Sequence, residues 1–376
     1  MEKAAKQKVL FISIIVFIAC NFLHAVVLEG VPFTEGPFSF YVATVAGSGK
    51  KGRADGIGAE ARFNWPTGVS AAGDGTLYVA DYSNSLIRRI DPSGSVTTLA
   101  GGSGGFKDAK GKDARFLGPN GITIDASGNL FVADADNFRI RKITPGGLAT
   151  TVAGNGVAGY MDGAGGEARF GYPTGIAIDG KGVLYVADRR THTIRKIAPG
   201  GVVTTLAGGG RAGFSDGTGE FSLLKEPVSV AASRDGVLYV SDSGNNAIRK
   251  ITPDGVITTL AGGKTAGYRD GAGMEASFSW PTGIAVDNNG NIYVCDSNNN
   301  KIRRITREGS TSTVAGTLLG GHSDGAGLRA GFNFPTGIAL DRLGNIYVAD
   351  SGNNRIRKIT YGETQKAMKE PNPWQR

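Results

Sequence analysis

The stretch PTGIALDRLGNIYVADSGNNRIRKI, residues 335–359, contains three short segments rich in apolar and β-branched residues. Gly, Asn and Asp separate these segments, and such residues permit the sharp reversals that join antiparallel strands. An earlier copy of the stretch continues through a Pro-Gly turn into a fourth segment, VVTTLAG (202–208). We therefore expect each copy to form a four-stranded antiparallel sheet.

Six copies of this unit follow one another along the chain. Sheets with two apolar faces are stable only when neighbouring sheets cover both faces, and radial packing around an axis achieves this. The sequence thus predicts an all-β, six-bladed β-propeller of four-stranded antiparallel blades over residues 41–360. The Asp that ends the Y/F-V-x-D motif marks the copies at intervals of 53 or 54 residues: Asp81, Asp134, Asp188, Asp242, Asp296 and Asp350.

The two ends of the repeated region complement each other. YVATVAG (41–47) has the pattern of a fourth strand but lacks the three strands that should precede it. The sixth unit stops after its third strand, RIRKIT (355–360). We expect these two segments to pair, so that the N-terminal strand completes the last blade and closes the ring.

The units resemble those of NHL-repeat propellers, whose blades follow the pattern P-x-G-I-A-x-D…G-x-L-Y-V-A-D-x-x-N-x-R-I. The best matches are residues 335–359 and PTGIAVDNNGNIYVCDSNNNKIRRI (281–305). The resemblance covers about residues 41–360 and implies the six-bladed fold. It does not assign an activity, because one fold supports many functions.

The first residues indicate export. A basic start is followed by the apolar run Val9 to Cys20, as in a secretory signal that cleavage after Ala25 would remove. We expect residues 1–25 to be a signal peptide or signal anchor and residues 26–40 a linker, giving a secreted or extracytoplasmic protein. Two alternatives are a membrane anchor through residues 9–28 and lipidation at Cys20. The polar residues 361–376 are expected to be a flexible tail.

Charge and cysteine content exclude some functions. The formal net charge is +8, but no dense Lys/Arg run is present, so nucleic-acid binding is not expected. Cys295 replaces a small strand residue of the other copies, which indicates a buried apolar site rather than a reactive thiol. We expect a monomer whose partner is a protein, peptide or glycan.

The connectors, which join the fourth strand of one unit to the first strand of the next, define the candidate binding face. In a four-stranded blade they lie on the same face as the turns between the second and third strands. The residue before the Pro that ends each connector is aromatic in four units, and exposed aromatics give large contact areas for a peptide, sugar or apolar ligand. The alternative is that they fill gaps between connectors. These aromatics are Trp65, Tyr172, Trp280 and Phe334.

One unit differs in its turn. VADRRTHTIRKI (186–197) stands where the last unit has VADSGNNRIRKI. Arg189, Arg190 and His192 therefore lie on the connector face near Arg169, and such a positive patch would suit an acidic partner or an anionic glycan. Solvated surface charge is the alternative interpretation.

The sequence gives little support for catalysis. Beyond the leader only His192 and His322 remain, so a zinc site with several His cannot form, and no metal or cofactor is expected. The connector Asp residues are too few per unit for a calcium cage and are expected to cap turns. The main prediction is a binding scaffold that uses the connector face. The alternative is a hydrolase or lyase with a site at the channel mouth near Glu226, because strictosidine-synthase-like propellers imply a single catalytic Glu.

Overall fold

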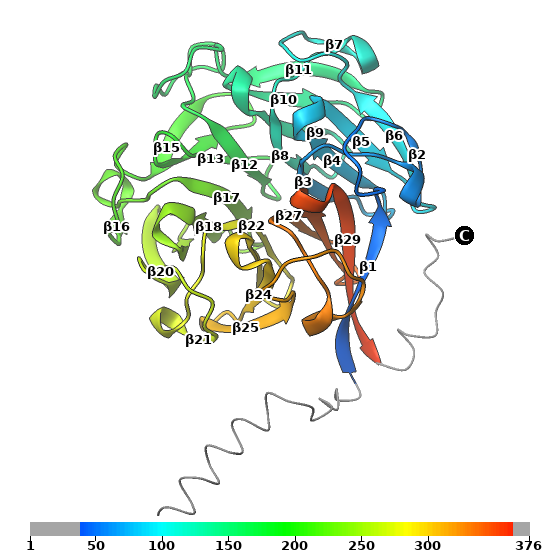
Figure 1. Cartoon of the computed structure of the whole chain (residues 1–376). Helices are drawn as coiled ribbons and strands as arrows, with labels where there is room; N and C mark the ends of the chain where they lie inside the picture. Colours follow the sequence, from blue (N-terminus) through cyan, green and yellow to red (C-terminus); the bar gives the residue numbers. More distant parts are fainter. Residues whose placement is uncertain (1–37, 364–376) are drawn as a thin grey trace, which may run out of the picture. The chain divides into compact units, whose positions relative to one another are not determined.

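Six antiparallel sheets surround a common axis in the computed structural model, which describes residues 38–363 (Figure 1). Each sheet is one predicted blade, and its strands follow the chain from the axis outward. The first three blades comprise β3 (Pro66–Ala71), β4 (Leu77–Asp81), β5 (Leu86–Ile90) and β6 (Ser95–Ala100); β8 (Pro119–Ile124), β9 (Leu130–Asp134), β10 (Arg139–Ile143) and β11 (Leu148–Ala153); and β12 (Pro173–Ile178), β13 (Leu184–Asp188), β14 (Thr193–Ile197) and β15 (Val203–Ala207).

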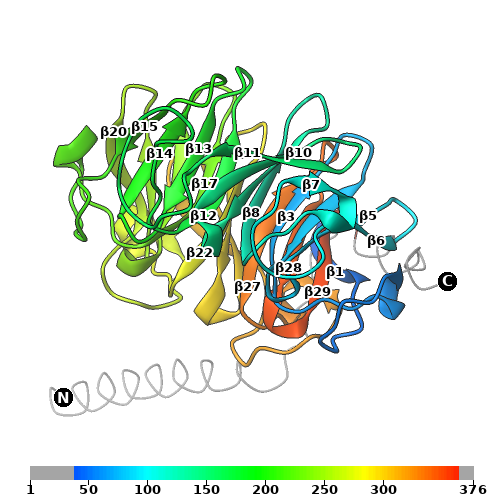
Figure 2. The same ribbon diagram turned by 90° about the horizontal axis from the view of Figure 1, so that it is seen from above.

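The other three blades repeat this order, and the turned view shows the inner strands gathered at the centre (Figure 2). The sixth blade takes its outer strand from the start of the described chain. These blades comprise β17 (Pro227–Ala232), β18 (Leu238–Asp242), β19 (Ala247–Ile251) and β20 (Val256–Gly262); β22 (Pro281–Val286), β23 (Ile292–Asp296), β24 (Lys301–Ile305) and β25 (Ser310–Ala315); and β27 (Pro335–Leu340), β28 (Ile346–Asp350), β29 (Arg355–Glu363) and β1 (Phe38–Ala46).

The predicted closure of the ring is confirmed. β1 lies between β29 and the short strand β26 in the sixth sheet, so the two ends of the propeller share one blade. β1 begins at Phe38 and β29 ends at Glu363, whereas the sequence placed the propeller boundaries at 41 and 360. The predicted leader lies outside the described residues, as do residues 26–37 of the linker and residues 364–376 of the tail. Within residues 38–363, no helix is long and apolar enough to cross a membrane.

Five of the sheets have a fifth strand that the sequence did not predict. In each case two connector residues pair with the outer strand of the blade, just after the connector Asp. In the first blade the Asp55 carboxylate accepts hydrogen bonds from the backbone N–H and the hydroxyl of Thr98, at 3.3 and 3.0 Å. These strands are β2 (Gly56–Ile57), β7 (Ala109–Lys110), β16 (Gly217–Thr218), β21 (Gly271–Ala272) and β26 (Gly325–Ala326).

Short 3-10 helices occupy both kinds of segment on the connector face. Five follow second strands, and five lie in connectors after the short outer strands. The first group is η2 (Tyr82–Asn84), η4 (Ala135–Asn137), η6 (Ser243–Asn245), η8 (Ser297–Asn299) and η10 (Ser351–Asn353), and the second is η1 (Gly58–Glu60), η3 (Gly111–Asp113), η5 (Gly219–Phe221), η7 (Gly273–Glu275) and η9 (Gly327–Arg329).

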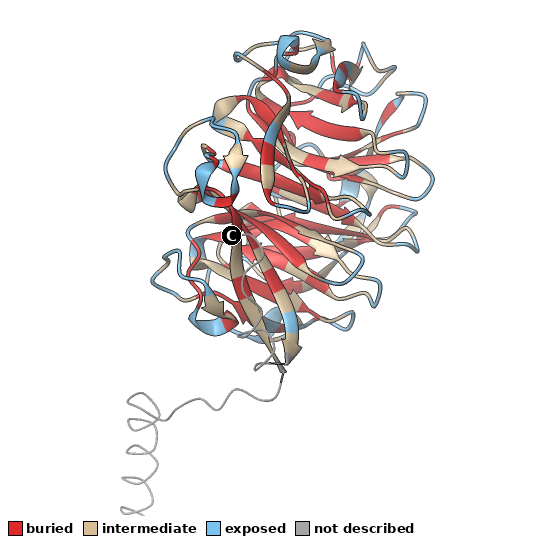
Figure 3. Ribbon diagram, turned by 90° about the vertical axis from the view of Figure 1, so that its right-hand side faces the viewer, coloured by how far each residue is buried: buried red, intermediate tan, exposed pale blue. Residues whose placement is uncertain are grey.

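The core lies between neighbouring blades, and most buried residues belong to the strands (Figure 3). Each blade face packs aliphatic side chains against the next blade, which removes apolar surface from water. Cys295 is one of these fully buried residues, as the sequence indicated, and burial raises the pKa of its thiol well above the ordinary value. A bulky connector residue closes each interface from the connector side and is fully buried: Phe63, Phe116, Phe170, Leu224, Phe278 and Phe332.

A buried ion pair fixes each connector to its blade, and sequence reasoning missed it. In the first blade the Arg88 guanidinium is 2.8 Å from Asp81 of β4 and 2.8 Å from the connector residue Asp55. Arg88 and Asp81 are both fully buried, and the guanidinium also lies 5.1 Å from the centre of the Phe63 ring. The connector Asp thus does more than cap a turn. The same arrangement recurs at Arg141, Arg195, Arg249, Arg303 and Arg357.

Candidate functional site

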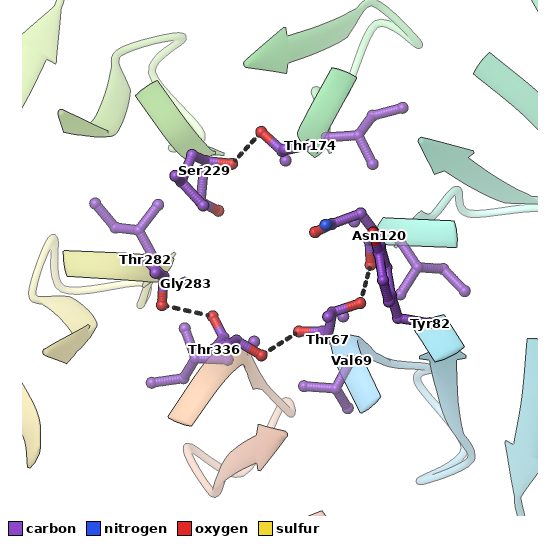
Figure 4. Close-up of a pocket in the computed structure, with 18 of the residues that line it drawn as sticks. Thr67, Val69, Tyr82, Asn120, Thr174, Ser229, Thr282, Gly283 and Thr336 are labelled. Carbon is purple, nitrogen blue, oxygen red and sulfur yellow. Dashed lines mark hydrogen bonds between the residues drawn. The ribbon is translucent and has the colours of Figure 1, made fainter. Parts of the chain in front are cut away.

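A cavity of about 280 Å³ opens on the connector face at the propeller axis (Figure 4). We call it the axial cavity. It is enclosed by the six inner strands and by the connector residues that precede them, so every blade contributes to its wall. Its lining has three layers: an aliphatic one, a polar one and an aromatic one.

The innermost layer is aliphatic. Each inner strand contributes one Val or Ile, three positions after the Pro that starts the strand. Each of these residues is only 3–7% exposed, and its side chain belongs to the apolar core between two blades. They are Val69, Ile122, Ile176, Val230, Ile284 and Ile338.

The middle layer is polar and connects the blades. In four blades the residue after the Pro is Thr, and its hydroxyl donates to a backbone carbonyl of the next blade (Figure 4). The Thr282 hydroxyl donates to the Thr336 carbonyl at 3.1 Å, and the Thr336 hydroxyl donates in turn to the Thr67 carbonyl at 3.0 Å. The second and fourth blades have Asn120 and Val228 at this position.

The outer layer contains the four aromatics predicted from the sequence. Trp65, Tyr172, Trp280 and Phe334 all line the axial cavity. The rings of Trp65 and Phe334 are 5.7 Å apart and tilted by 33°. The structure therefore gathers residues from four blades into one aromatic rim.

The backbone holds three of these aromatics in an unusual conformation. Trp65, Trp280 and Phe334 have φ values of 56°, 53° and 50°, a region that bulky residues rarely adopt. An Asn side chain from the preceding blade fixes each one by accepting its backbone N–H; the Asn246 side chain accepts that of Trp280 at 2.9 Å. Such strain persists only where surrounding contacts enforce it, and it often occurs at functional sites.

Tyr82, which sequence reasoning missed, completes the rim. Its hydroxyl lies 3.0 Å from the Tyr172 hydroxyl and 3.2 Å from the Asp136 carboxylate. Burial raises the pKa of both tyrosines, so both remain neutral. At the second blade, a Cβ on Gly118 would overlap the Asp136 carboxylate, so Tyr82 and Asp136 fill the space of an aromatic side chain there. Gly118 stands where four other units have an aromatic residue, and this difference was the one sign in the sequence that another side chain fills the space.

The structure separates the predicted basic residues. Arg189 lines the axial cavity, with its guanidinium 5.2 Å from the centre of the Trp280 ring and 3.5 Å from the Glu226 carboxylate. Arg190 is exposed and lies 4.8 Å from the centre of the Tyr172 ring. Arg169 is exposed and does not line the axial cavity. Of this group, Arg189 alone therefore reaches the cavity.

His192 has a structural contact instead of a place in the axial cavity. Its Nδ1 accepts the backbone N–H of Glu226 at 3.0 Å, across the interface between the third and fourth blades. An imidazole nitrogen can accept a hydrogen bond only when it is unprotonated. Burial lowers the pKa of His192, consistent with the neutral form.

Glu226, the residue of the enzymatic alternative, does not line the axial cavity. Its carboxylate pairs with Arg189 at the edge of the cavity, and its backbone N–H is held by His192. Within the described part of the chain, no group of three or more His, Cys, Asp or Glu residues is placed to hold a metal ion.

The repeat units match a known family. The sequence model of the NHL repeat matches residues 63–90, 116–143, 170–197, 278–305 and 332–359. The chain is an NHL-repeat protein. The match omits the fourth unit, which differs from the other units of this NHL chain at three positions. Leu224 replaces a Phe, Glu226 replaces an aromatic residue or Gly, and Ser229 replaces a Gly.

Relatives share the repeat region but are longer. The chain is 33% identical over 285 residues to SUPPRESSOR OF QUENCHING 1, chloroplastic, of Arabidopsis thaliana, covering 70% of this chain and 27% of that protein. It is 32% identical over 303 residues to human NHL repeat-containing protein 2, covering 70% of this chain and 42% of that one. The NHL chain thus spans less than half the length of either relative.

Solved structures share the fold. An auxiliary nutrient binding protein from Bacteroides thetaiotaomicron has a TM-score of 0.67 to this NHL chain at 19% sequence identity. The match covers 87% of this chain and 77% of that one. At this level of identity the likeness concerns the propeller fold alone.

Proposed function

We propose that this NHL-repeat protein is an exported binding scaffold that holds the end of a peptide or glycan in the axial cavity. The observation that supports this most directly is the aromatic rim, where Trp65, Tyr172, Trp280 and Phe334 meet around one opening. Export is supported by the basic start and the apolar run Val9 to Cys20. The nutrient-binding protein of related fold is consistent with a binding role.

Physical chemistry favours binding by this rim. Trp and Tyr provide large, rigid contact areas and lose little conformational entropy when a ligand stacks on them. The aliphatic residues of the lining are fixed in the core between blades, and hydrogen bonds in the Thr layer hold the wall in place. The site is therefore organised before the ligand arrives, which lowers the entropic cost of binding.

Charged groups outside the cavity offer a further contact for a partner. The exposed side chains of Arg190 and Arg169 can approach an acidic group, while the charge of Arg189 is balanced by Glu226. An acidic partner would thus use the surface beside the rim. Exposed ion pairs of this kind contribute about 0–1 kcal/mol each, so the aromatics should dominate the affinity.

The test uses peptide and glycan arrays with the wild-type protein and the variant Trp65→Ala plus Trp280→Ala. Removing a central aromatic commonly costs about 2 kcal/mol or more, roughly a 30-fold loss of affinity per residue. A control variant removes two exposed aromatics that do not line the cavity, Phe221→Ala plus Tyr268→Ala. Unchanged binding by the first variant would contradict the proposal.

A further inference from the structure

Two blades lack the Thr that the other four blades contribute to the polar layer of the axial cavity. In the other four blades the Thr hydroxyl donates a hydrogen bond to a carbonyl of the next blade, so it joins neighbouring blades. The second blade has Asn120 at this position. The fourth blade has Val228, followed by Ser229 where the other blades have Gly.

Asn120 and Ser229 leave polar groups facing the axial cavity. Figure 4 shows the Asn120 side chain directed into the opening, and Ser229 also lines it. Among residues 38–363, no hydrogen bond joins either side chain to another residue, although backbone atoms of both residues take part in bonds. An amide offers two donors and one acceptor, and a hydroxyl offers one donor and two acceptor sites. These groups are therefore free to bind a ligand.

The charge of the lining argues against an ionic ligand. The axial cavity has no Asp, Glu or Lys in its wall, and Arg189 is its one charged residue among those described. The Arg189 guanidinium already lies against Trp280 and pairs with Glu226. A ligand that needed a counter-charge would have to disrupt this pair.

The layered shape also limits what can enter. The volume of about 280 Å³ lies at the lower end of the range of ligand pockets, so the cavity suits one small group, such as the end of a polymer. A sugar ring matches the aromatic and polar layers, because its C–H face can stack on aromatic rings while its hydroxyls both donate and accept hydrogen bonds. Unpaired polar groups in a buried site discriminate strongly against ligands that cannot satisfy them.

We propose that the axial cavity recognises the terminal sugar of an uncharged glycan, and that Asn120 and Ser229 determine its specificity. This inference rests on the proposed binding function and narrows it to one ligand class. The Trp and Phe rings of the rim supply the stacking surface, and the two polar side chains select the arrangement of hydroxyls.

The chain itself supplies variants that should preserve the fold. Asn120→Thr introduces the residue that four other blades have at this position, where its hydroxyl can donate to the Thr174 carbonyl of the third blade. Ser229→Gly introduces the residue that the other five blades have. Both variants remove a free polar group from the axial cavity. Thermal unfolding of each variant checks that the propeller remains intact.

The probes are an array of neutral oligosaccharides, comprising glucans, mannans and xylans, and an array of their sulfated forms beside a peptide array. We expect the full chain to bind at least one neutral oligosaccharide. Asn120→Thr should weaken that binding at least tenfold, and Ser229→Gly should change the preference among neutral sugars. The control variant Phe221→Ala plus Tyr268→Ala should bind as the wild type does.

Other outcomes overturn different statements. Binding of a peptide or a sulfated glycan, with no neutral oligosaccharide bound, would reject the inference and leave the proposed binding function standing. Unaltered neutral-glycan affinity and selectivity in both Asn120→Thr and Ser229→Gly would reject the specificity role of these residues. Absence of binding on all three arrays would reject both the inference and the proposed function.

Discussion

His192 illustrates how one residue can look functional in a sequence and be structural in the fold. Three other blades place Asn at the equivalent turn position, and each Asn side chain accepts the backbone N–H of the residue before the next Pro. His192 makes the same contact through Nδ1 to Glu226. The imidazole thus replaces an amide oxygen as an acceptor between blades.

This replacement predicts a pH-dependent stability. Burial lowers the pKa of His192 below the ordinary value; Glu226 and Asp188 act to raise it, and Lys225 acts to lower it. Because the unfolded chain takes up a proton at His192 more readily than the folded protein, protonation favours unfolding. The contribution of neutral His192 to stability is therefore full above about pH 6.5 and declines as the pH falls below it. His192→Asn should flatten this decline.

Thermal unfolding in buffers from about pH 7.5 to 5 provides the measurement. The exposed residue His322 supplies a matched control, and His322→Asn should retain the wild-type profile. Equal slopes for the wild type and His192→Asn would show that the imidazole takes up protons equally in the folded and unfolded states, and would contradict the prediction.

At the residue scale, sequence reasoning found most of the rim but misjudged what some side chains do. The four aromatics were visible because they share one position in the repeat. The hydrogen-bond partner of His192 could not be seen in the sequence, because the backbone N–H of Glu226 belongs to the next blade, 34 residues further on. Tyr82 was missed for a similar reason, since its contact with Tyr172 joins residues 90 positions apart.

The inner strands depend on glycine at one position. A Cβ on Gly283 would overlap the Thr336 carbonyl of the next blade, and the equivalent Gly residues of four other blades face similar backbone contacts. Blades can therefore approach closely at the axis only without a side chain there. This explains why the P-x-G pattern recurs in five of the six units.

Gly283→Ala should destabilise the propeller by about 1–3 kcal/mol, because the fifth and sixth blades must separate or shift to admit the methyl group. The control is Gly180→Ala, in a turn where nothing lies within 4 Å of the new Cβ. Chemical unfolding of both variants measures the difference. Equal stabilities would contradict the close-packing explanation.

At the scale of strands and connectors, periodicity predicted the blades but not the charges within them. In the strand RIRKI (139–143), Arg141 of β10 is fully buried and paired with Asp134 and Asp108. Asp108 lies 33 positions earlier, and its approach depends on the path of the whole connector. The short outer strands depend on the same path, so the local pattern could not reveal them.

The whole molecule depends on the strand that closes its ring. Val42, Val45 and Ala46 of β1 are at most 1% exposed, and β1 covers the free edge of β29. A chain that begins at Gly47 should expose this edge and the adjoining core, so we expect aggregation and a lower unfolding temperature. Size-exclusion chromatography and thermal unfolding measure both effects.

A chain that begins at Phe38 is the matched comparison, because it retains all of β1. It should remain soluble and keep the unfolding temperature of the full chain. If the chain that begins at Gly47 behaved in the same way, closure by β1 would not contribute to stability.

The direction of the closing strands determines how the molecule can be presented on a support. β1 runs toward the connector face and β29 runs away from it, so Phe38 and Glu363 lie side by side at the opposite end of the propeller (Figure 1). A tether joined directly to Glu363 would therefore attach on the side of the propeller away from the opening. A sensor chip or bead coated in this way would leave the axial cavity accessible to material from solution.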